Sequence, residues 1–223
     1  MLYLVPTPVG NLGDITVRAR EVLETVDFVL AEDTRNTGKL LQHLGLSAKM
    51  QSFHAHNEHH RVDGYVERLQ SGETLALVSD AGTPAISDPG FLLVRACKEA
   101  GVEVTCLPGA TAFVPALAAS GLPCDRFHFE GFLPQKKGRK TRLDYLASLP
   151  HTFALYESPH RLVKCLAQLS EVCGPERMAC VAREISKMHE DIKTAPLSEL
   201  CAHYKGQAKV RGEIVIVVGP AVA

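Results

Sequence analysis

The chain has 223 residues, 46% of them hydrophobic, and a formal net charge of −1. This apolar content can build one large or two small packed domains, and no stretch approaches the roughly 20 apolar residues of a transmembrane helix. The near-neutral charge excludes a chain that is basic throughout. The seven cysteines include no C-x-x-C pair, and residues 1–6 do not resemble a signal peptide. We therefore expect reduced thiols, a cytoplasmic location and no membrane partner.

In the first 120 residues, short apolar runs alternate with amphipathic segments. The segment that ends near Gly72 carries Val62, Tyr65 and Leu69 on one helical face. Strand–helix repeats with short connections are typical of a parallel sheet flanked by helices, so we predict an N-terminal α/β domain over residues 1–120. Its strands are expected at residues 2–5, 28–31, 50–53, 74–79 and 102–107.

The turn Gly121-Leu122-Pro123 follows a short alanine-rich helix near residues 111–120, and we place the domain boundary there. In the C-terminal α/β domain, residues 121–223, one helix is expected to open at Ser158-Pro159. Two consecutive strands come late in the order, which predicts a mixed sheet. The expected strands are 126–130, 152–156, 178–182, 189–194 and 213–218, and further helices are expected at 138–148 and 197–204.

The loop over residues 79–90 follows the apolar run 75–78 and contains two glycines, two prolines and two aspartates. Open α/β sheets bind ligands at the carboxyl ends of their strands, where such loops lie. Gly82 and Gly90 allow a close approach of the backbone to a ligand, and the prolines stiffen the path. A loop that only reverses the chain uses the same residue types, but the length and the paired carboxylates favour a binding site.

The loop after the first predicted strand contains Gly10-Asn11-Leu12-Gly13-Asp14. This pattern lacks one glycine of the dinucleotide fingerprint G-x-G-x-x-G, and no Walker lysine follows it. Pro6 and Pro8 also remove backbone donors that a diphosphate would need. The loop therefore favours a ligand without phosphates, and Asp14 is expected to cap a helix.

Glu32, Asp33 and Arg35 follow the second predicted strand. Carboxylates and a guanidinium at such a position can orient a ribose or accept a proton from a hydroxyl. Thr34 or Asn36 would serve equally well as a cap of the next helix.

The histidines at positions 54, 56, 59 and 60 match no common zinc spacing, and no second cluster completes a ligand set. We therefore predict no metal site.

A local basic run interrupts the otherwise neutral chain. Its members are Lys136, Lys137, Arg139, Lys140 and Arg142. Such a run can bind phosphates of a nucleic acid, because each neutralised phosphate releases counterions. The alternative is an ordinary solvated loop and helix start.

Eight short blocks of the chain, in one order, resemble the tetrapyrrole methylase superfamily, whose members use S-adenosylmethionine. The resemblance runs nearly end to end, and within the superfamily it is strongest to the ribosomal branch. The first loop departs from the glycine-richer G-x-G-x-G-D form of the wider superfamily, as in that branch, which counts against a corrin or porphyrin substrate. The blocks are residues 7–16, 32–35, 79–90, 108–109, 120–123, 131–134, 156–161 and 183–184.

The resemblance implies two α/β domains with S-adenosylmethionine bound in the cleft between them, and a homodimer. It also implies 2′-O-methylation of a decoding-centre cytidine in 16S ribosomal RNA, with the RNA or the small ribosomal subunit as partner. A methyltransferase for a corrin or porphyrin precursor and a non-catalytic RNA-binding assembly factor remain the alternatives.

By position, several loops are expected to contact the cofactor. The residues are Pro8, Gly10, Ser79, Asp80, Ala81, Gly82, Thr83, Thr111, Ala112, Tyr156, Glu157 and Ala182. Removing the proton of a ribose hydroxyl needs a base, for which Asp33 is the first candidate and Glu184 the second. Arg35 is expected to stabilise the alkoxide. The basic run is expected to hold the RNA phosphates, beside Phe127, Phe129 and Phe132, whose rings could stack on bases. Phe127 and Phe129 alternate along a predicted strand, so the alternative is that they belong to the core.

Overall fold

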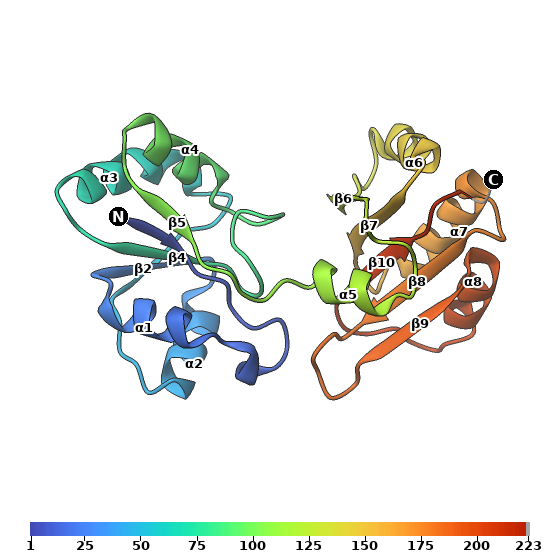
Figure 1. The fold of residues 1–223 in the computed structure, drawn as a ribbon, viewed down its shortest axis with the longest axis horizontal. Coiled ribbons are helices and arrows are strands. Elements are labelled where there is room, and N and C mark those ends of the chain that lie inside the picture. The colour runs from blue at the N-terminus through green and yellow to red at the C-terminus, as the bar shows by residue number, and fades with distance from the viewer. Residues whose placement is uncertain (222–223) are drawn as a thin grey trace. The chain divides into compact units, whose positions relative to one another are not determined.

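A computed structural model describes residues 1–221 and divides the chain into two compact units, Met1–Thr111 and the part from Ala112 onward. The first unit is built around a parallel sheet and the second around a mixed sheet, with helices packed on both (Figure 1). The predicted fold class is confirmed. None of the helices within residues 1–221 combines the length and the apolarity needed to cross a membrane.

The first unit contains five parallel strands in the order β3-β2-β4-β1-β5. The strands are β1 (Leu2–Leu4), β2 (Phe28–Ala31), β3 (Met50–Ser52), β4 (Leu75–Val78) and β5 (Val104–Cys106). The helices are η1 (Leu12–Asp14), α1 (Val17–Thr25), α2 (Thr34–His43), α3 (Glu58–Gln70) and α4 (Phe91–Glu99). The strands are shorter than predicted at several ends but lie where the apolar runs indicated.

Helices cover both faces of this sheet. Successive strand residues point to opposite faces, so Leu75 and Leu77 of β4 pack toward α3 and α4, whereas Ala76 and Val78 pack toward α1 and α2. Figure 1 shows the two helix pairs on opposite sides of the strands. Because all five strands are parallel, their carboxyl ends share one edge, and the loops singled out from the sequence leave the sheet there.

The second unit contains a five-stranded sheet in the order β6-β7-β10-β8-β9. β6 and β7 are parallel, whereas β10 runs antiparallel to both of its neighbours and β9 runs antiparallel to β8. The strands are β6 (Phe127–Phe132), β7 (Thr152–Glu157), β8 (Met178–Arg183), β9 (Asp191–Pro196) and β10 (Ile214–Val218). The helices are α5 (Phe113–Ala119), α6 (Arg139–Ser148), α7 (Leu162–Cys173) and α8 (Leu197–Lys205).

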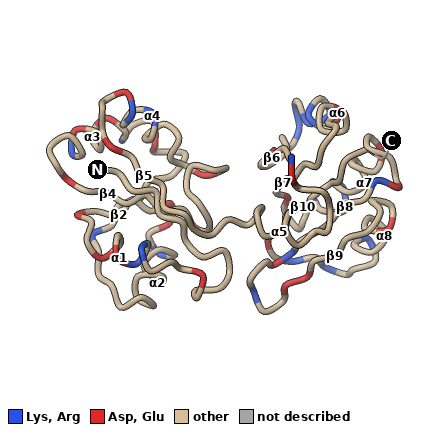
Figure 2. Tube along the Cα trace, in the orientation of Figure 1, with Lys and Arg blue, Asp and Glu red and all other residues tan. Residues whose placement is uncertain are grey.

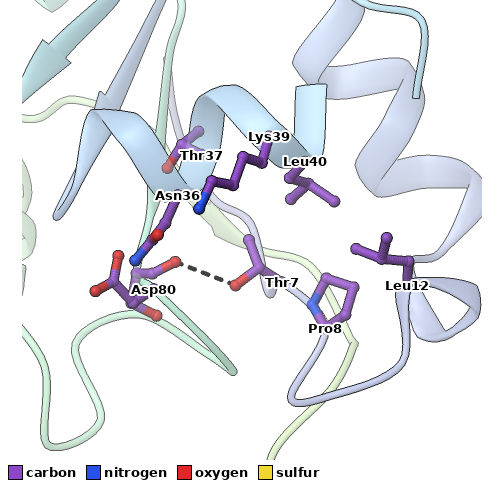
Figure 3. Close-up of a pocket in the computed structure, with 9 residues that line it drawn as sticks. Thr7, Pro8, Leu12, Asn36, Thr37, Lys39, Leu40 and Asp80 are labelled. Carbon is purple, nitrogen blue, oxygen red and sulfur yellow. Dashed lines mark hydrogen bonds between the residues drawn. The ribbon is translucent and has the colours of Figure 1, made fainter. Parts of the chain in front are cut away.

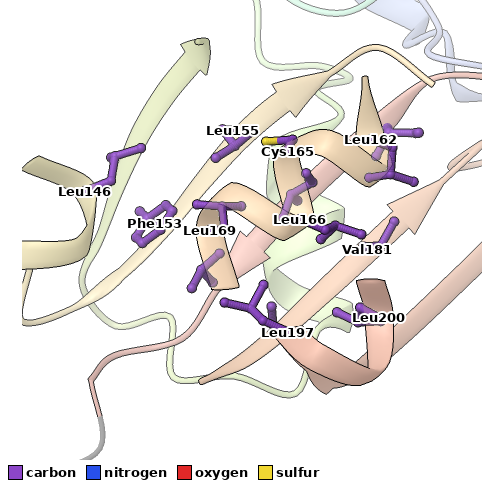
Figure 4. Close-up of a cluster of buried hydrophobic side chains, with 14 of the residues drawn as sticks. Leu146, Phe153, Leu155, Leu162, Cys165, Leu166, Leu169, Val181, Leu197 and Leu200 are labelled. Atoms are coloured by element: carbon purple, nitrogen blue, oxygen red, sulfur yellow. The ribbon is translucent and has the colours of Figure 1, made fainter. Parts of the chain in front are cut away.

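The main core of this unit lies between the sheet and the helices α6, α7 and α8. Leu166 and Leu169 of α7 are fully buried against Phe153 and Leu155 of β7 (Figure 4). Leu162, Cys165, Leu166 and Leu169 recur at three- and four-residue intervals, which explains why this apolar segment folds as a helix.

Helix α5 packs on the other face of the same sheet. Ala116 and Leu117 form an apolar cluster with Ala154, Cys180 and Val217. The unit therefore begins at Ala112 rather than after residue 120, because the alanine-rich helix buries its apolar side against β7 and β10. The glycine–proline turn that suggested the boundary lies inside the second unit.

Helix α7 begins at Leu162, later than the predicted start at Ser158-Pro159. Residues 158–161 form a turn that the N–H of Arg161 closes on the carbonyl of Ser158 (2.9 Å). The N–H of Ser158 donates to the carboxylate of Glu157 (2.7 Å), and so does the Arg161 side chain (2.8 Å). The Glu157 carboxylate thus accepts the hydrogen bonds at the start of this segment, and Ser158 does not cap α7.

Candidate functional site

Hydrogen bonds from backbone and hydroxyl groups bring together the loops that follow β1, β4 and β5. Thr7 and Gly82 exchange two of them, from Thr7 N to Gly82 O (2.9 Å) and from Gly82 N to Thr7 O (2.8 Å). The Thr7 hydroxyl donates to Ser79 O (3.1 Å), and the Thr83 hydroxyl donates to Ala110 O (3.1 Å). The predicted cofactor-binding residues of the first unit therefore lie on adjacent turns. These residues are Pro8, Gly10, Ser79, Asp80, Ala81, Gly82, Thr83 and Thr111.

The far end of the 79–90 loop is fixed by a buried carboxylate that the sequence did not reveal. Glu58 of α3 accepts hydrogen bonds from Gly90 N (3.1 Å) and Leu92 N (3.0 Å) at the start of α4. Gly90 has φ +134°, and a Cβ there would lie 2.6 Å from Leu77 Cδ2, so only glycine fits. Within the loop, Ala85 also has a positive φ, which stores strain near the predicted site.

Three carboxylates, Glu32, Asp80 and Asp88, lie near this edge, and none forms an ion pair within residues 1–221. Burial raises the pKa of Glu32, although the N–H of Asp80 donates to it (3.2 Å) and opposes the rise. Burial, with the charges of Glu32 and Asp80, raises the pKa of Asp88 to about 6. Within the described part of the chain, no three His, Cys, Asp or Glu side chains are arranged to hold a metal ion.

The raised pKa of Asp88 predicts a destabilising charge at neutral pH. A carboxyl whose folded-state pKa exceeds its unfolded value of about 3.9 stabilises the fold below that value, and this contribution is lost as the pH rises through about 6. We expect Asp88→Asn to raise the free energy of unfolding by about 1 kcal/mol at pH 7, because solvent screens a partly exposed group. At pH 4 the gain should nearly vanish. Urea unfolding at both pH values measures the difference, and an equal effect at both would contradict it.

Asp33 caps helix α2, a role that the sequence assigned to Thr34 or Asn36. Its carboxylate accepts from Arg35 N (2.8 Å) and from the Arg35 guanidinium, with Nη2 at 2.6 Å from Oδ2. Hydrogen bonds from Arg35 lower the pKa of Asp33 to about 2. The Arg35 side chain is paired with Asp33 but 86% exposed, so other anions can approach its guanidinium from solvent.

The predicted helix cap at Asp14 is wrong. Asp14 lies in η1, and α1 is capped instead by Thr16, whose hydroxyl accepts from Ala19 N (3.0 Å). Asn11 caps η1 by accepting from Gly13 N (3.0 Å). The short helix η1 lies between the loop and α1, and its three residues are too few to show the apolar periodicity that predicts a helix.

In the second unit, Ala112, Tyr156 and Ala182 belong to one apolar cluster beneath α5. Ala182 is fully buried, while Tyr156 is half-buried between Phe129 (ring centroids 5.1 Å apart) and Phe132 (5.4 Å). These predicted cofactor-binding positions are therefore neighbours.

Glu157 is buried, and its carboxylate is fully engaged. Besides Arg161 and the N–H of Ser158, it accepts from Arg139 Nη2 (3.3 Å). Arg139 itself is only 6% exposed, and it also donates to Gln168 Oε1 (2.9 Å) and to a backbone carbonyl. Glu157 can therefore meet a ligand only through its backbone, and the guanidinium of Arg139 is not presented to a phosphate.

The other residues of the basic run are of two kinds, one arginine that is paired and three lysines that are not. Arg142 Nε donates to Glu130 Oε1 (2.7 Å), so its charge is already paired. Lys136, Lys137 and Lys140 are exposed and form no ion pair within residues 1–221. Figure 2 shows the basic segment at the start of α6. These three lysines, called the α6 lysine group below, are the part of the run that is open to solvent.

Glu184, the second candidate base, holds a loop in place. Its carboxylate accepts from Lys187 Nζ (2.7 Å) and from Glu213 N (3.1 Å), and its own φ is +54°. The hydrogen bond from Lys187 lowers the pKa of Glu184.

A pocket of about 150 Å³ opens beside the turns of the first unit. Its lining includes the predicted Pro8, Ser79 and Asp80, but most of the lining comes from residues that were not predicted to contact a ligand. The additional residues are Thr7, Leu12, Asn36, Thr37, Lys39 and Leu40 (Figure 3).

Comparison with known proteins gives consistent results. A profile of the family Tetrapyrrole (Corrin/Porphyrin) Methylases matches residues 1–201. The chain is 51% identical to the Ribosomal RNA small subunit methyltransferase I of Escherichia coli O157:H7, covering 97% of this chain and 77% of the relative. It is 50% identical to the protein of the same name from Vibrio cholerae, covering 98% and 76%. The crystal structure of the methyltransferase CobJ superimposes with a TM-score of 0.73 at 23% identity, covering 99% of this chain and 94% of that one, which shows the shared fold.

Proposed function

Because the chain belongs to the tetrapyrrole (corrin/porphyrin) methylase family, we propose that it transfers a methyl group from S-adenosylmethionine to the 16S ribosomal RNA of the small subunit. The observation that carries this proposal is the similarity, over nearly the whole of this chain, to relatives that are named as ribosomal RNA small subunit methyltransferases. We further propose the ribose 2′-hydroxyl of a cytidine as the acceptor, a cytoplasmic location and a homodimeric state.

The edge of the first unit fits the methyl donor chemically. When bound, S-adenosylmethionine would supply a methyl group on a cationic sulfur, and it carries an ammonium group and no phosphate. Glu32 and Asp88 offer negative charge, and neither forms an ion pair within residues 1–221. The adjacent turns would hold the donor through backbone groups, with Pro8, Gly10 and residues 79–83 as the proposed contacts.

We propose Asp33 as the base that accepts the hydroxyl proton, with Glu184 as the alternative. In the structure, Arg35 holds the pKa of Asp33 at about 2, so Asp33 is a weak base while the ion pair is closed. If Arg35 turns to the developing alkoxide, it stabilises that charge and releases the carboxylate in the same movement. Opening of the Asp33–Arg35 ion pair would then couple removal of the hydroxyl proton to substrate binding.

Under this proposal, Asp33→Asn should lower the methylation rate at saturating donor by about 100-fold or more, because general-base catalysis contributes about that much. Glu184→Gln is the comparison variant for the alternative base. Single-turnover methylation with labelled donor measures both. Near-normal transfer by Asp33→Asn together with a loss in Glu184→Gln would assign the base to Glu184.

The α6 lysine group is proposed to bind RNA phosphates, and Phe127 and Phe132 are proposed to contact its bases. These rings are 43% and 55% exposed, and Phe132 continues an aromatic row through Tyr156 and Phe129. Unpaired RNA bases stack on such rings. The arrangement suits a single-stranded segment rather than a regular duplex.

Incubation with labelled S-adenosylmethionine tests the whole proposal. Three acceptors are offered in parallel: small ribosomal subunits, free 16S ribosomal RNA and a tetrapyrrole precursor. We expect label in RNA, at the 2′-oxygen of a cytidine when the product is digested to nucleosides. Label in the tetrapyrrole alone would favour the small-molecule alternative, and donor-independent RNA binding without transfer would favour an assembly factor.

A further inference from the structure

The pocket beside α2 has a polar end and an apolar end. Asn36, Lys39 and Leu40 lie three and four positions apart on α2, so they share one helix face. In Figure 3, Asn36 and Lys39 extend on the side of Asp80, whereas Leu40, Leu12 and Pro8 form the other end. The pocket therefore offers a flat ligand apolar walls and a polar edge.

The side chains at the polar end form no hydrogen bond or ion pair with residues 1–221. The Asn36 amide and the Lys39 ammonium are exposed and form no hydrogen bond or ion pair within residues 1–221. Asp80 is likewise exposed, and its carboxylate forms no ion pair in the same range. Two donors and one acceptor are thus available to a ligand side by side.

The pocket is large enough for a single aromatic ring. A cavity of about 150 Å³ is the size that accepts a single benzene ring in other proteins. A six-membered heterocycle therefore fits this pocket, which is open to solvent on one side.

The polar edge distinguishes between the two pyrimidines. Cytosine presents an exocyclic amino group, which donates to carboxylates, next to a ring nitrogen and a carbonyl that accept. Asp80 matches the amino group, and Asn36 and Lys39 match the acceptors. Uracil has a carbonyl in place of the amino group, so it would set one acceptor against the Asp80 carboxylate.

We propose that this pocket binds the base of the nucleotide to be methylated and selects cytosine, with Asp80 accepting from the amino group and Asn36 and Lys39 donating to the ring. The inference rests on the proposed function, because it needs an RNA substrate. The target base must leave its stack to enter, as in other enzymes that act on single nucleotides.

The test compares RNA substrates that carry either cytidine or uridine at the nucleotide found to be methylated. We expect the unmodified chain to prefer cytidine by about 10-fold to 100-fold in kcat/KM, the range of one good polar base contact. The double variant Asn36→Ala/Lys39→Ala should reduce this preference by about tenfold and leave donor affinity within about twofold. The control Gln42→Ala/Lys49→Ala removes the same two chemical groups at exposed positions outside the pocket and should keep the preference.

Three results would overturn the inference. In the first, the pocket variant loses activity equally on both substrates, which would mean that Lys39 holds phosphate rather than base. In the second, calorimetry shows weakened donor binding while the cytidine preference persists, which would place the adenine of the donor in the pocket. In the third, the preference is unchanged. If the unmodified chain labels no RNA at all, the proposed function fails instead, and the two failures are distinct.

Discussion

Arg139→Ala is expected to lower the free energy of unfolding by about 3 kcal/mol, the largest stability effect we predict for a single substitution. The substitution leaves the Glu157 carboxylate buried with one ion-pair partner fewer, and breaking a buried pair costs about 3–5 kcal/mol. Arg161 and the N–H of Ser158 still donate to Glu157 in this variant, so we expect a loss at the lower end of that range. Urea unfolding followed by far-UV circular dichroism measures it.

Lys140→Ala is the matched control for this experiment. Lys140 is the next residue of α6, it is exposed, and its removal should change the free energy of unfolding by less than about 0.5 kcal/mol. A second check replaces the buried pair by apolar side chains in the double variant Arg139→Met/Glu157→Leu, which should recover part of the loss. Equal small effects of Arg139→Ala and Lys140→Ala would show that the Arg139 guanidinium does not stabilise the interior.

Charge reversal of the α6 lysine group is expected to weaken RNA binding by about 100-fold or more at 0.1 M salt. Each phosphate contact to a single strand contributes about 0.7 to the slope of log affinity against log salt. Loss of three contacts should therefore reduce the slope by about 2. Titration of labelled RNA with Lys136→Glu/Lys137→Glu/Lys140→Glu at several salt concentrations measures affinity and slope together.

A second triple variant separates local contacts from net charge. Lys164, Lys205 and Lys209 are exposed lysines in or after α7 and α8, so their reversal changes the total charge by the same amount. This control should leave most of the affinity and the salt slope in place. If both triple variants weaken binding equally, the α6 lysine group is not a specific RNA contact.

Much of the fold was predictable because local patterns and tertiary packing agree. The fully apolar residues of β4 indicated a strand buried on both faces, and the heptad-like spacing of Val62, Tyr65 and Leu69 indicated the buried face of α3. The order of strands and helices then implied a parallel sheet in the first unit. The shared edge of the loops follows from that topology alone.

The roles of charged residues were harder to predict, because they depend on partners far away in the sequence. The basic run looked uniform, yet Arg139, Leu143 and Leu146 share the inner face of α6, so that one arginine turns inward to Glu157. The helical periodicity indicated that Arg139 faces inward. The Glu157 carboxylate that compensates its buried charge lies on β7, eighteen residues later in the sequence. Glu58 gave no signal, since its two hydrogen-bond donors lie more than thirty residues away.

The unpaired carboxylates at the edge of the first unit have a consequence for how ligand binding responds to acidity. Asp88 is about half protonated near pH 6, and a cation placed beside it favours the ionised form. Association with a positively charged molecule must then expel protons into the medium, and its affinity must fall as the solution is acidified through that range. The measured heat will accordingly vary with the ionisation enthalpy of the buffer, and Asp88→Asn should diminish that variation.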